Sequence, residues 1–131
     1  MNGLDTNVLV RYLTQDDKTQ AARAGRYLAA LVARGDRAFI GPVVLCELVW
    51  VLRDAYDTPK ADVIRTMERI LDTTQFEIGS KDLVRQALDA YRTGGGDFAD
   101  YLIGAMATDA GCEETATFDR GLKGADGFRV L

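Results

Sequence analysis

The side chains whose types and positions suggest chemistry are five carboxylates: Asp5, Glu47, Asp97, Asp100 and Asp119. Two of them directly follow expected strands, and the other three stand in segments that are otherwise largely apolar. Carboxylates that gather in one place repel one another unless a positive charge lies among them. Because ligation by oxygen atoms alone favours a hard ion, the pattern predicts a site for Mg²⁺ or Mn²⁺.

Each carboxylate also has an ordinary structural interpretation. Asp5 and Asp97 can cap the helices that follow them by accepting backbone hydrogen bonds, and Asp119 can stand in a simple turn. Asp97 and Asp100 can also share one helix face, so that Asp97 caps the helix while Asp100 binds metal. Glu47 is harder to explain, because its helical neighbours are apolar and an unpaired carboxylate among apolar groups is costly. We expect Glu47 to bind metal; the alternative is a protonated Glu47, or one paired with a buried arginine.

The chain contains no histidine among its 131 residues. That excludes Ser-His-Asp and Cys-His catalysis, histidine general bases and imidazole metal ligands together. The cysteines, Cys46 and Cys112, lie far apart in the sequence and are expected to be reduced thiols. Any hydrolytic chemistry must therefore depend on carboxylates, hydroxyls, Lys or Arg, or a hard metal ion.

Length and composition predict one globular domain over residues 1–131. Hydrophobic residues make up 47% and charged residues 27% of the chain, which is ordinary for a protein with one hydrophobic core. No apolar run approaches the roughly 20 residues that span a bilayer. The segment Met1–Asp5 lacks the pattern of a secretory signal, so we expect a cytoplasmic protein.

Short strands are expected to alternate with helices along the chain. The expected strands cover residues 3–5, 38–40, 76–78, 115–117 and 128–131. The expected helices cover residues 8–13, 18–34, 42–56 and 97–110. Two more helices are expected between them, one capped by Thr58 with Pro59 in its first position, and one capped by Ser80. This alternation predicts an α/β fold with a central parallel sheet of about five strands and helices on both faces. In such a sheet the ends of the first and fourth strands can lie side by side, so that Asp5 and Asp119 would face each other across a crevice.

Four segments of the chain resemble the PIN domains of VapC-type toxins. They are Leu4–Arg11, the apolar helix with Glu47, Asp97–Ile103 and Thr117–Asp119, and in order and spacing they cover essentially the whole chain. The resemblance implies a catalytic and metal-binding set of acids, called here the acidic quartet: Asp5, Glu47, Asp100 and Asp119. It also implies that Asp97 is an additional acid of the site. Three further residues would orient the site: Thr6, Asn7 and Thr117. Gly104 departs from the family, since relatives more often carry Ala there.

The resemblance also implies an activity and partners. Family members cleave RNA with Mg²⁺ or Mn²⁺, usually as homodimers, and a cognate VapB-like antitoxin silences them. Asp5 and Asp119 would hold the ion, and Asp100 and Glu47 would bind it directly or through water, for metal-assisted hydrolysis of RNA phosphodiester bonds. The identity of the general base, the number of ions and the RNA target stay open at this stage.

The formal net charge of −4 is unusual for a protein that binds RNA. Acids gathered in one metal site would account for part of it. Contacts to the RNA backbone would then come from cations near the motifs: Arg11, Arg53, Arg120 and Lys123. Plain surface solvation is the alternative for each of these side chains.

Two other functions fit part of the pattern. A Mg²⁺-dependent phosphotransfer enzyme or a receiver-like domain also has an Asp after a strand. However, Asn7 stands where a haloacid-dehalogenase-type phosphatase needs its second Asp, and neither class needs Glu47. A catalytically silent module with a PIN fold is the second alternative, and the retention of all four acids argues against it.

Apolar residues near the end of the third expected helix raise a separate question. Trp50, Leu52 and Tyr56 are expected to fill the core, as large apolar side chains usually do. The alternative is a surface for a second copy of the chain or for an antitoxin.

Overall fold

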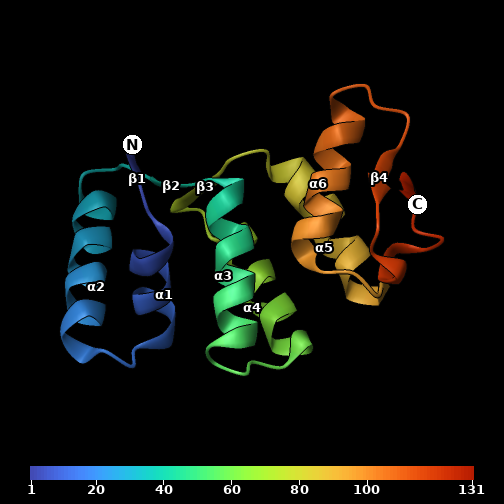
Figure 1. Cartoon of the computed structure of the whole chain (residues 1–131). Helices are drawn as coiled ribbons and strands as arrows, with labels where there is room; N and C mark the ends of the chain where they lie inside the picture. Colours follow the sequence, from blue (N-terminus) through green and yellow to red (C-terminus); the bar gives the residue numbers. More distant parts are fainter. The chain divides into compact units, whose positions relative to one another are not determined.

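The computed structural model describes all residues, Met1–Leu131. The chain divides into two compact units, Met1–Gly79 and Ser80–Leu131, and each is described by itself (Figure 1). Both units combine helices with parallel strands, which confirms the α/β class predicted from the sequence. No helix is both long enough and apolar enough to cross a membrane.

The first unit contains three short strands and four helices. In order they are β1 (Asn2–Gly3), α1 (Thr6–Thr14), α2 (Lys18–Ala33), β2 (Ala38–Ile40), α3 (Pro42–Asp54), α4 (Lys60–Asp72) and β3 (Phe76–Ile78). The strands pair in parallel in the order β1-β2-β3, with Gly3 beside Phe39 and Ile40 beside Ile78. Because β1 and β2 point the same way, α1 and α3 both begin at the carboxyl edge of this sheet.

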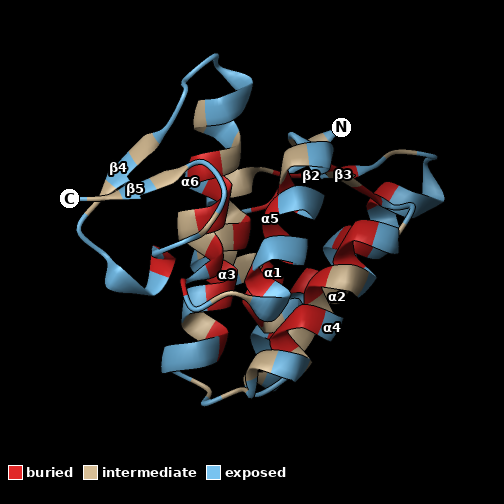
Figure 2. Ribbon diagram, turned by 90° about the vertical axis from the view of Figure 1, so that its right-hand side faces the viewer, coloured by how far each residue is buried: buried red, intermediate tan, exposed pale blue.

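The core of the first unit is built from one buried stripe on each helix (Figure 2). The sequence period predicted the stripe of α4 correctly, and its buried residues include Val63, Met67, Ile70 and Leu71. The buried residues of α3 are Leu45, Leu48, Val49 and Leu52. The opposite face of α3 is therefore left toward solvent, and that face carries Glu47.

The second unit contains two longer helices and a pair of strands. In order they are α5 (Lys81–Thr93), α6 (Phe98–Asp109), β4 (Thr115–Thr117), the 3₁₀ helix η1 (Arg120–Leu122) and β5 (Phe128–Val130). The rings of Tyr91 and Phe98 meet edge to face with centroids 6.2 Å apart, and this contact joins the end of α5 to the start of α6. Strands β4 and β5 pair in parallel, with Thr115 beside Phe128.

The three glycines between α5 and α6 are packed tightly. The Gly96 N–H donates to the Tyr101 hydroxyl at 3.0 Å. A Cβ atom added at Gly94 would lie 1.9 Å from that same hydroxyl, and one at Gly96 would lie 2.5 Å from a methyl carbon of Leu122. Glycine is required at both positions because neighbouring side chains fill the space that a Cβ would need.

Gly104 has a similar explanation. It is buried on α6, and a Cβ atom there would lie 2.6 Å from the Phe128 ring. The absence of a side chain at Gly104 therefore lets β5 pack closely on α6.

The sheet differs from the expected single sheet of about five strands. Hydrogen bonds join β1, β2 and β3 in one sheet, and β4 and β5 in a second. The expected strands are present, but each has only two or three residues and makes few ladder bonds. The segment 118–127, which contains η1, connects the end of β4 to the start of β5, so that the two strands pair in parallel.

Two predicted helix beginnings also need correction. Helix α4 begins at Lys60 with Pro59 as its cap residue, and not with Thr58 as cap and Pro59 inside the helix. Thr58 is held by the preceding helix, since its N–H donates to the Leu52 carbonyl at 2.9 Å. Ser80 does precede α5 as predicted, but it lies in the left-handed region with φ 51° and its side chain makes no capping hydrogen bond.

Candidate functional site

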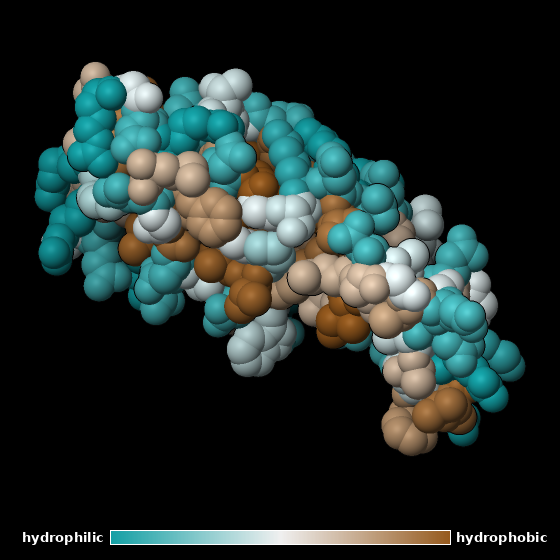
Figure 3. Space-filling view, turned by 90° about the horizontal axis from the view of Figure 1, so that it is seen from above, coloured by the Kyte–Doolittle hydropathy of each residue, from teal (hydrophilic) through white to brown (hydrophobic).

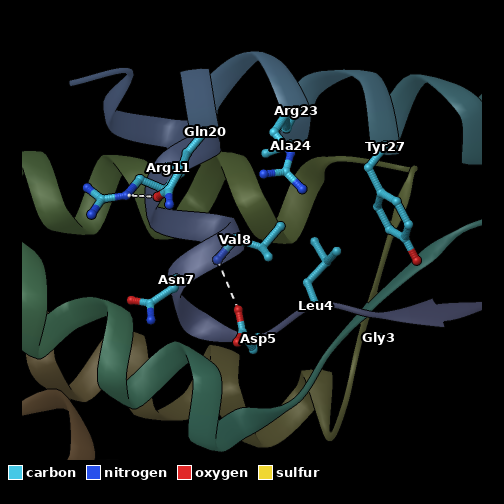
Figure 4. A pocket seen from close by; sticks show the side chains of 10 residues that line it. All are labelled: Gly3, Leu4, Asp5, Asn7, Val8, Arg11, Gln20, Arg23, Ala24 and Tyr27. Carbon is cyan, nitrogen blue, oxygen red and sulfur yellow. Dashed lines mark hydrogen bonds between the residues drawn. The ribbon is translucent and has the colours of Figure 1, made fainter. Parts of the chain in front are cut away.

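Asp5 stands at the start of α1, directly after β1. One carboxylate oxygen, Oδ1, accepts the Val8 N–H at 3.0 Å, so the side chain caps the helix (Figure 4). No hydrogen bond or ion pair engages the other oxygen, and the residue is exposed. The ordinary interpretation of Asp5 is therefore correct for one oxygen and leaves the second one available.

Thr6 connects Asp5 with Glu47. The Thr6 hydroxyl donates to Glu47 Oε1 at 3.1 Å, across the space between α1 and α3. The contact forms because both helices begin at the same sheet edge, and it places a second carboxylate one hydrogen bond from the residue that follows Asp5. Thr6 thus has a contact suited to orienting Glu47, which is the role that the family resemblance implied for it.

Glu47 is exposed, and this corrects the reason given for singling it out. Its helical companions Val43 and Trp50 are apolar, but they are 72% and 66% exposed. The expected burial of Trp50 is therefore wrong, because the core side of α3 is occupied by other residues. Leu52 is buried as expected, while Tyr56 is half-buried and donates its hydroxyl to Asp16.

The exposed part of α3 is one of several places where large hydrophobic side chains reach the surface. The others include Ile103 and Met106 of α6, which are 56% and 45% exposed, and Phe118 after β4. On the face drawn in Figure 3, hydrophobic side chains form small groups among hydrophilic ones. The apolar surroundings of Glu47 are thus a surface feature rather than a core.

Two of the acids stand at the start of α6. Asp97 stands at the N-cap position of the helix, as predicted, and its own N–H donates to Asp100 Oδ2 at 3.0 Å. Asp100 is half-buried, whereas Asp97 is exposed. Besides the metal-binding role predicted for it, Asp100 therefore uses one oxygen to hold the helix start, and no hydrogen bond engages its other oxygen.

Asp119 directly follows β4, as expected, and caps η1. Its Oδ1 accepts the Gly121 N–H at 2.8 Å, and its own N–H donates to the Thr117 hydroxyl at 3.0 Å. Thr117 therefore holds the backbone of Asp119 rather than its carboxylate. Asp119 is exposed, and its second oxygen has no partner.

The five acids share one electrostatic property, which is that none of them forms an ion pair. Asp16 is a useful contrast, because the Tyr56 hydroxyl and then the Thr14 hydroxyl lower its pKa below 3.8 by hydrogen bonding to the charged form. Free carboxylate oxygens without cationic partners fit a hard divalent ion as ligands. In the structure, however, no three acidic or cysteine side chains form a group that could hold a metal ion.

The acidic quartet is divided between the two units. Asp5 and Glu47 belong to Met1–Gly79, and Asp100 and Asp119 belong to Ser80–Leu131 together with Asp97. The Thr6 hydrogen bond connects the first pair, while in the second unit Asp97 and Asp100 are connected through the helix cap. A metal site made from all four acids stays a prediction.

A pocket of about 680 Å³ adjoins Asp5 in the first unit. Side chains from α1 and α2 line it, among them Asn7, Arg11, Gln20, Arg23 and Tyr27 (Figure 4). Asn7 is exposed here and makes no hydrogen bond through its side chain. Sequence reasoning missed the contribution of α2, although residues 20, 23, 24 and 27 have the spacing of one helix face.

The cations named from the sequence are only partly available. The Arg11 guanidinium donates to Gln20 at 2.8 Å and pairs with Asp16 at 3.3 Å, while Arg53 donates to the Thr58 carbonyl at 3.2 Å. Arg120 and Lys123, by contrast, are exposed and form no ion pair. The structure adds Arg23, which is exposed in the pocket and also without an ion pair.

Comparison with known proteins agrees with the motifs. The family model described as "PIN domain" matches residues 4–127, which include every acid discussed above. This chain belongs to the PIN-domain family. Within that family it is similar to a protein named "VapC ribonuclease" from Aquifex aeolicus (strain VF5), with 29% identity over 132 residues that cover 100% of this chain and 96% of the relative. The resemblance inferred from the motifs is thereby confirmed, and PIN membership also sets aside the phosphotransfer and receiver-like alternatives.

Proposed function

We propose that this PIN-domain chain is a metal-dependent endoribonuclease, the toxin of a toxin–antitoxin pair. Two findings support the proposal: the match to the PIN family over residues 4–127 and the likeness to a VapC ribonuclease over the full chain. The observation in the structure that supports it best is the hydrogen bond from Thr6 to Glu47. That bond brings Glu47 beside the start of α1, where Asp5 presents a free carboxylate oxygen.

The acidic quartet provides the ligands in this proposal. Asp5 and Asp119 would hold Mg²⁺ or Mn²⁺, and Asp100 and Glu47 would bind it directly or through water, with Asp97 as an additional acid. When bound, such an ion would supply a water of lowered pKa and a positive charge beside the phosphoryl oxygens. Thr6 orients Glu47, Thr117 fixes the backbone of Asp119, and Asn7 lines the pocket together with Asp5. Both units are needed, so the domain in this proposal is the whole chain, 1–131.

The partners follow from the same proposal. The substrate is RNA, a VapB-like antitoxin covers the toxin, and the chain acts as a homodimer in the cytoplasm. The exposed apolar residues Val43 and Trp50 give α3 a surface that a protein partner can cover. Sedimentation of the purified chain, alone and with the product of a neighbouring short reading frame, tests both protein partners.

The first experiment compares RNA cleavage by the wild-type chain and by Asp5→Asn, with Mg²⁺, Mn²⁺ or EDTA. We expect the variant to lose about two orders of magnitude in rate or more, because asparagine keeps the cap but removes a charged ligand. Asp17→Asn is a matched control, since Asp17 caps α2 by accepting the Gln20 N–H at 3.0 Å, as Asp5 caps α1. That control should cleave at the wild-type rate.

Three outcomes would contradict the proposal in different ways. Cleavage that persists in EDTA would contradict the metal dependence. Equal activity of the Asp5→Asn and Asp17→Asn variants would contradict the role of Asp5 in the site. An absence of cleavage on mixed cellular RNA, together with an absence of metal binding, would favour the catalytically silent PIN module.

A further inference from the structure

The pocket beside Asp5 lies within the first unit, between α1 and α2. Leu4 and Val8 line its floor, and Arg23 and Tyr27 enter it from α2 (Figure 4). Its volume of about 680 Å³ falls within the range of pockets that hold small ligands or parts of larger ones. Asp5 borders it, so a chain lying in the pocket would pass the carboxylate.

The pocket presents one unpaired cation, although the protein as a whole is acidic. Two arginines, Arg11 and Arg23, line it against a single carboxylate, Asp5, although the chain carries a net charge of −4. Arg11 is held by Asp16 and Gln20. Arg23 has no such partner and is exposed, so its guanidinium is free to form a bidentate contact with an anion such as a phosphate.

Tyr27 adds a flat apolar surface one helical turn from Arg23. Tyr27 is 43% exposed, and its hydroxyl accepts a hydrogen bond from the Asn2 amide at 2.6 Å, which holds the ring in position. Unpaired bases of single-stranded RNA stack on aromatic rings of this kind, whichever base they are.

We propose that Arg23 and Tyr27 form a substrate subsite, in which Arg23 binds a backbone phosphate of single-stranded RNA and Tyr27 stacks on a neighbouring base. The inference rests on the proposed ribonuclease function and adds to it a place where the strand is held. RNA is favoured over an acidic peptide because the pocket pairs one free cation with one exposed ring. That combination matches the phosphate and base of a nucleotide.

The test measures binding of a short fluorescent single-stranded RNA by anisotropy, with every variant carrying Asp5→Asn so that the RNA stays intact. Arg23→Gln is compared with Arg26→Gln over a series of salt concentrations. Arg26 is a matched control because it is an exposed arginine of the same helix that does not line the pocket. A melting curve for each variant confirms that it is folded.

We expect Arg23→Gln to weaken binding by about threefold to tenfold and to reduce the salt slope by roughly 0.7, the value for one phosphate contact on a single strand. Arg26→Gln should change neither quantity. Arg23→Lys should keep the salt slope, because it keeps the charge. Tyr27→Leu should weaken binding by at least about fivefold at every salt concentration while leaving the slope unchanged.

Equal affinities and slopes for Arg23→Gln and Arg26→Gln would overturn the subsite. So would a loss in Arg23→Gln that appears for an oligoglutamate peptide but not for RNA. The two proposals fail separately. Metal-dependent cleavage, together with normal RNA binding by Arg23→Gln, would support the nuclease proposal and contradict the subsite. RNA binding that depends on Arg23, without any cleavage, would support the subsite and contradict the nuclease proposal.

Discussion

One oxygen of each quartet carboxylate is held by a hydrogen bond, and the other has no partner. Three of these bonds come from backbone N–H groups at the start of a helix, for Asp5, Asp100 and Asp119. The same side chain can therefore stabilise the fold with one oxygen and bind a cation with the other. Substitution by asparagine separates the two roles, because it keeps an acceptor and removes the charge.

The orienting role proposed for Thr6 gives a prediction at the scale of one side chain. Thr6→Val removes the hydroxyl that donates to Glu47 Oε1 and should lower kcat for RNA cleavage by roughly tenfold, with little change in KM. Thr6→Ser keeps the hydroxyl and should restore most of the rate. Steady-state kinetics check both variants, and a Thr6→Ser enzyme as slow as Thr6→Val would show that the methyl group, not the hydrogen bond, is what matters.

The helices and strands were largely predictable, and the exceptions have local causes. The positions of β2, β3 and β4 follow from short apolar or β-branched runs, and the structure has them at the expected residues. Trp50 was misplaced because a helix that is apolar on nearly every side gives no period from which to tell its buried face. The role of Thr58 was missed because its contact is with the end of the preceding helix.

The close contact between α6 and β5 gives a prediction about stability. Gly104→Ala should lower the free energy of unfolding by about 1–3 kcal/mol, because the new Cβ would lie 2.6 Å from the Phe128 ring. The same change at Gly25, in the middle of α2, meets no atom within 4 Å and should raise stability by up to about 1 kcal/mol. Urea denaturation measures both, and a stabilised Gly104→Ala would show that Phe128 moves aside freely.

The contact between Tyr56 and Asp16 gives a pH dependence. The Tyr56 hydroxyl is the main cause that holds the pKa of Asp16 below 3.8, so this contact stabilises the fold above that pH and the contribution is lost as pH falls through the lowered pKa. Tyr56→Phe should therefore lower Tm at neutral pH, and its difference from wild type should shrink below about pH 4. Tyr12→Phe is the control, since the Tyr12 hydroxyl forms no hydrogen bond, and a Tyr56→Phe difference that stays constant with pH would contradict the linkage.

At the scale of the whole molecule, the candidate site is divided between Met1–Gly79 and Ser80–Leu131. The sequence could place each acid after a strand or at a helix start, because those are local features. It could not predict that the strands form sheets of three and two, since the pairing of short strands depends on contacts between segments far apart in the chain. The position of each carboxylate was therefore predictable from the sequence, whereas the pairing of the strands was not.

The assembly of the acidic quartet can be tested through metal-dependent stability. If one ion binds acids of both units, Mn²⁺ at about 100 times its Kd should stabilise the wild-type chain by roughly 2.7 kcal/mol, seen as a rise in Tm. Asp5→Asn in the first unit and Asp119→Asn in the second should each abolish most of that rise, and Asp17→Asn should keep it. A rise lost in only one of the two site variants would mean that a single unit binds the ion.

The packed glycines between α5 and α6 affect how mutational surveys of this protein would look. A saturation screen that selects for loss of toxicity would return Gly94 and Gly96 beside the acids, because any larger residue collides with Tyr101 or Leu122. Neither glycine takes part in the chemistry proposed here. The glycine variants would disappear from cells through proteolysis, whereas Asp→Asn variants of the quartet would accumulate as inactive protein, so an abundance readout separates the two classes.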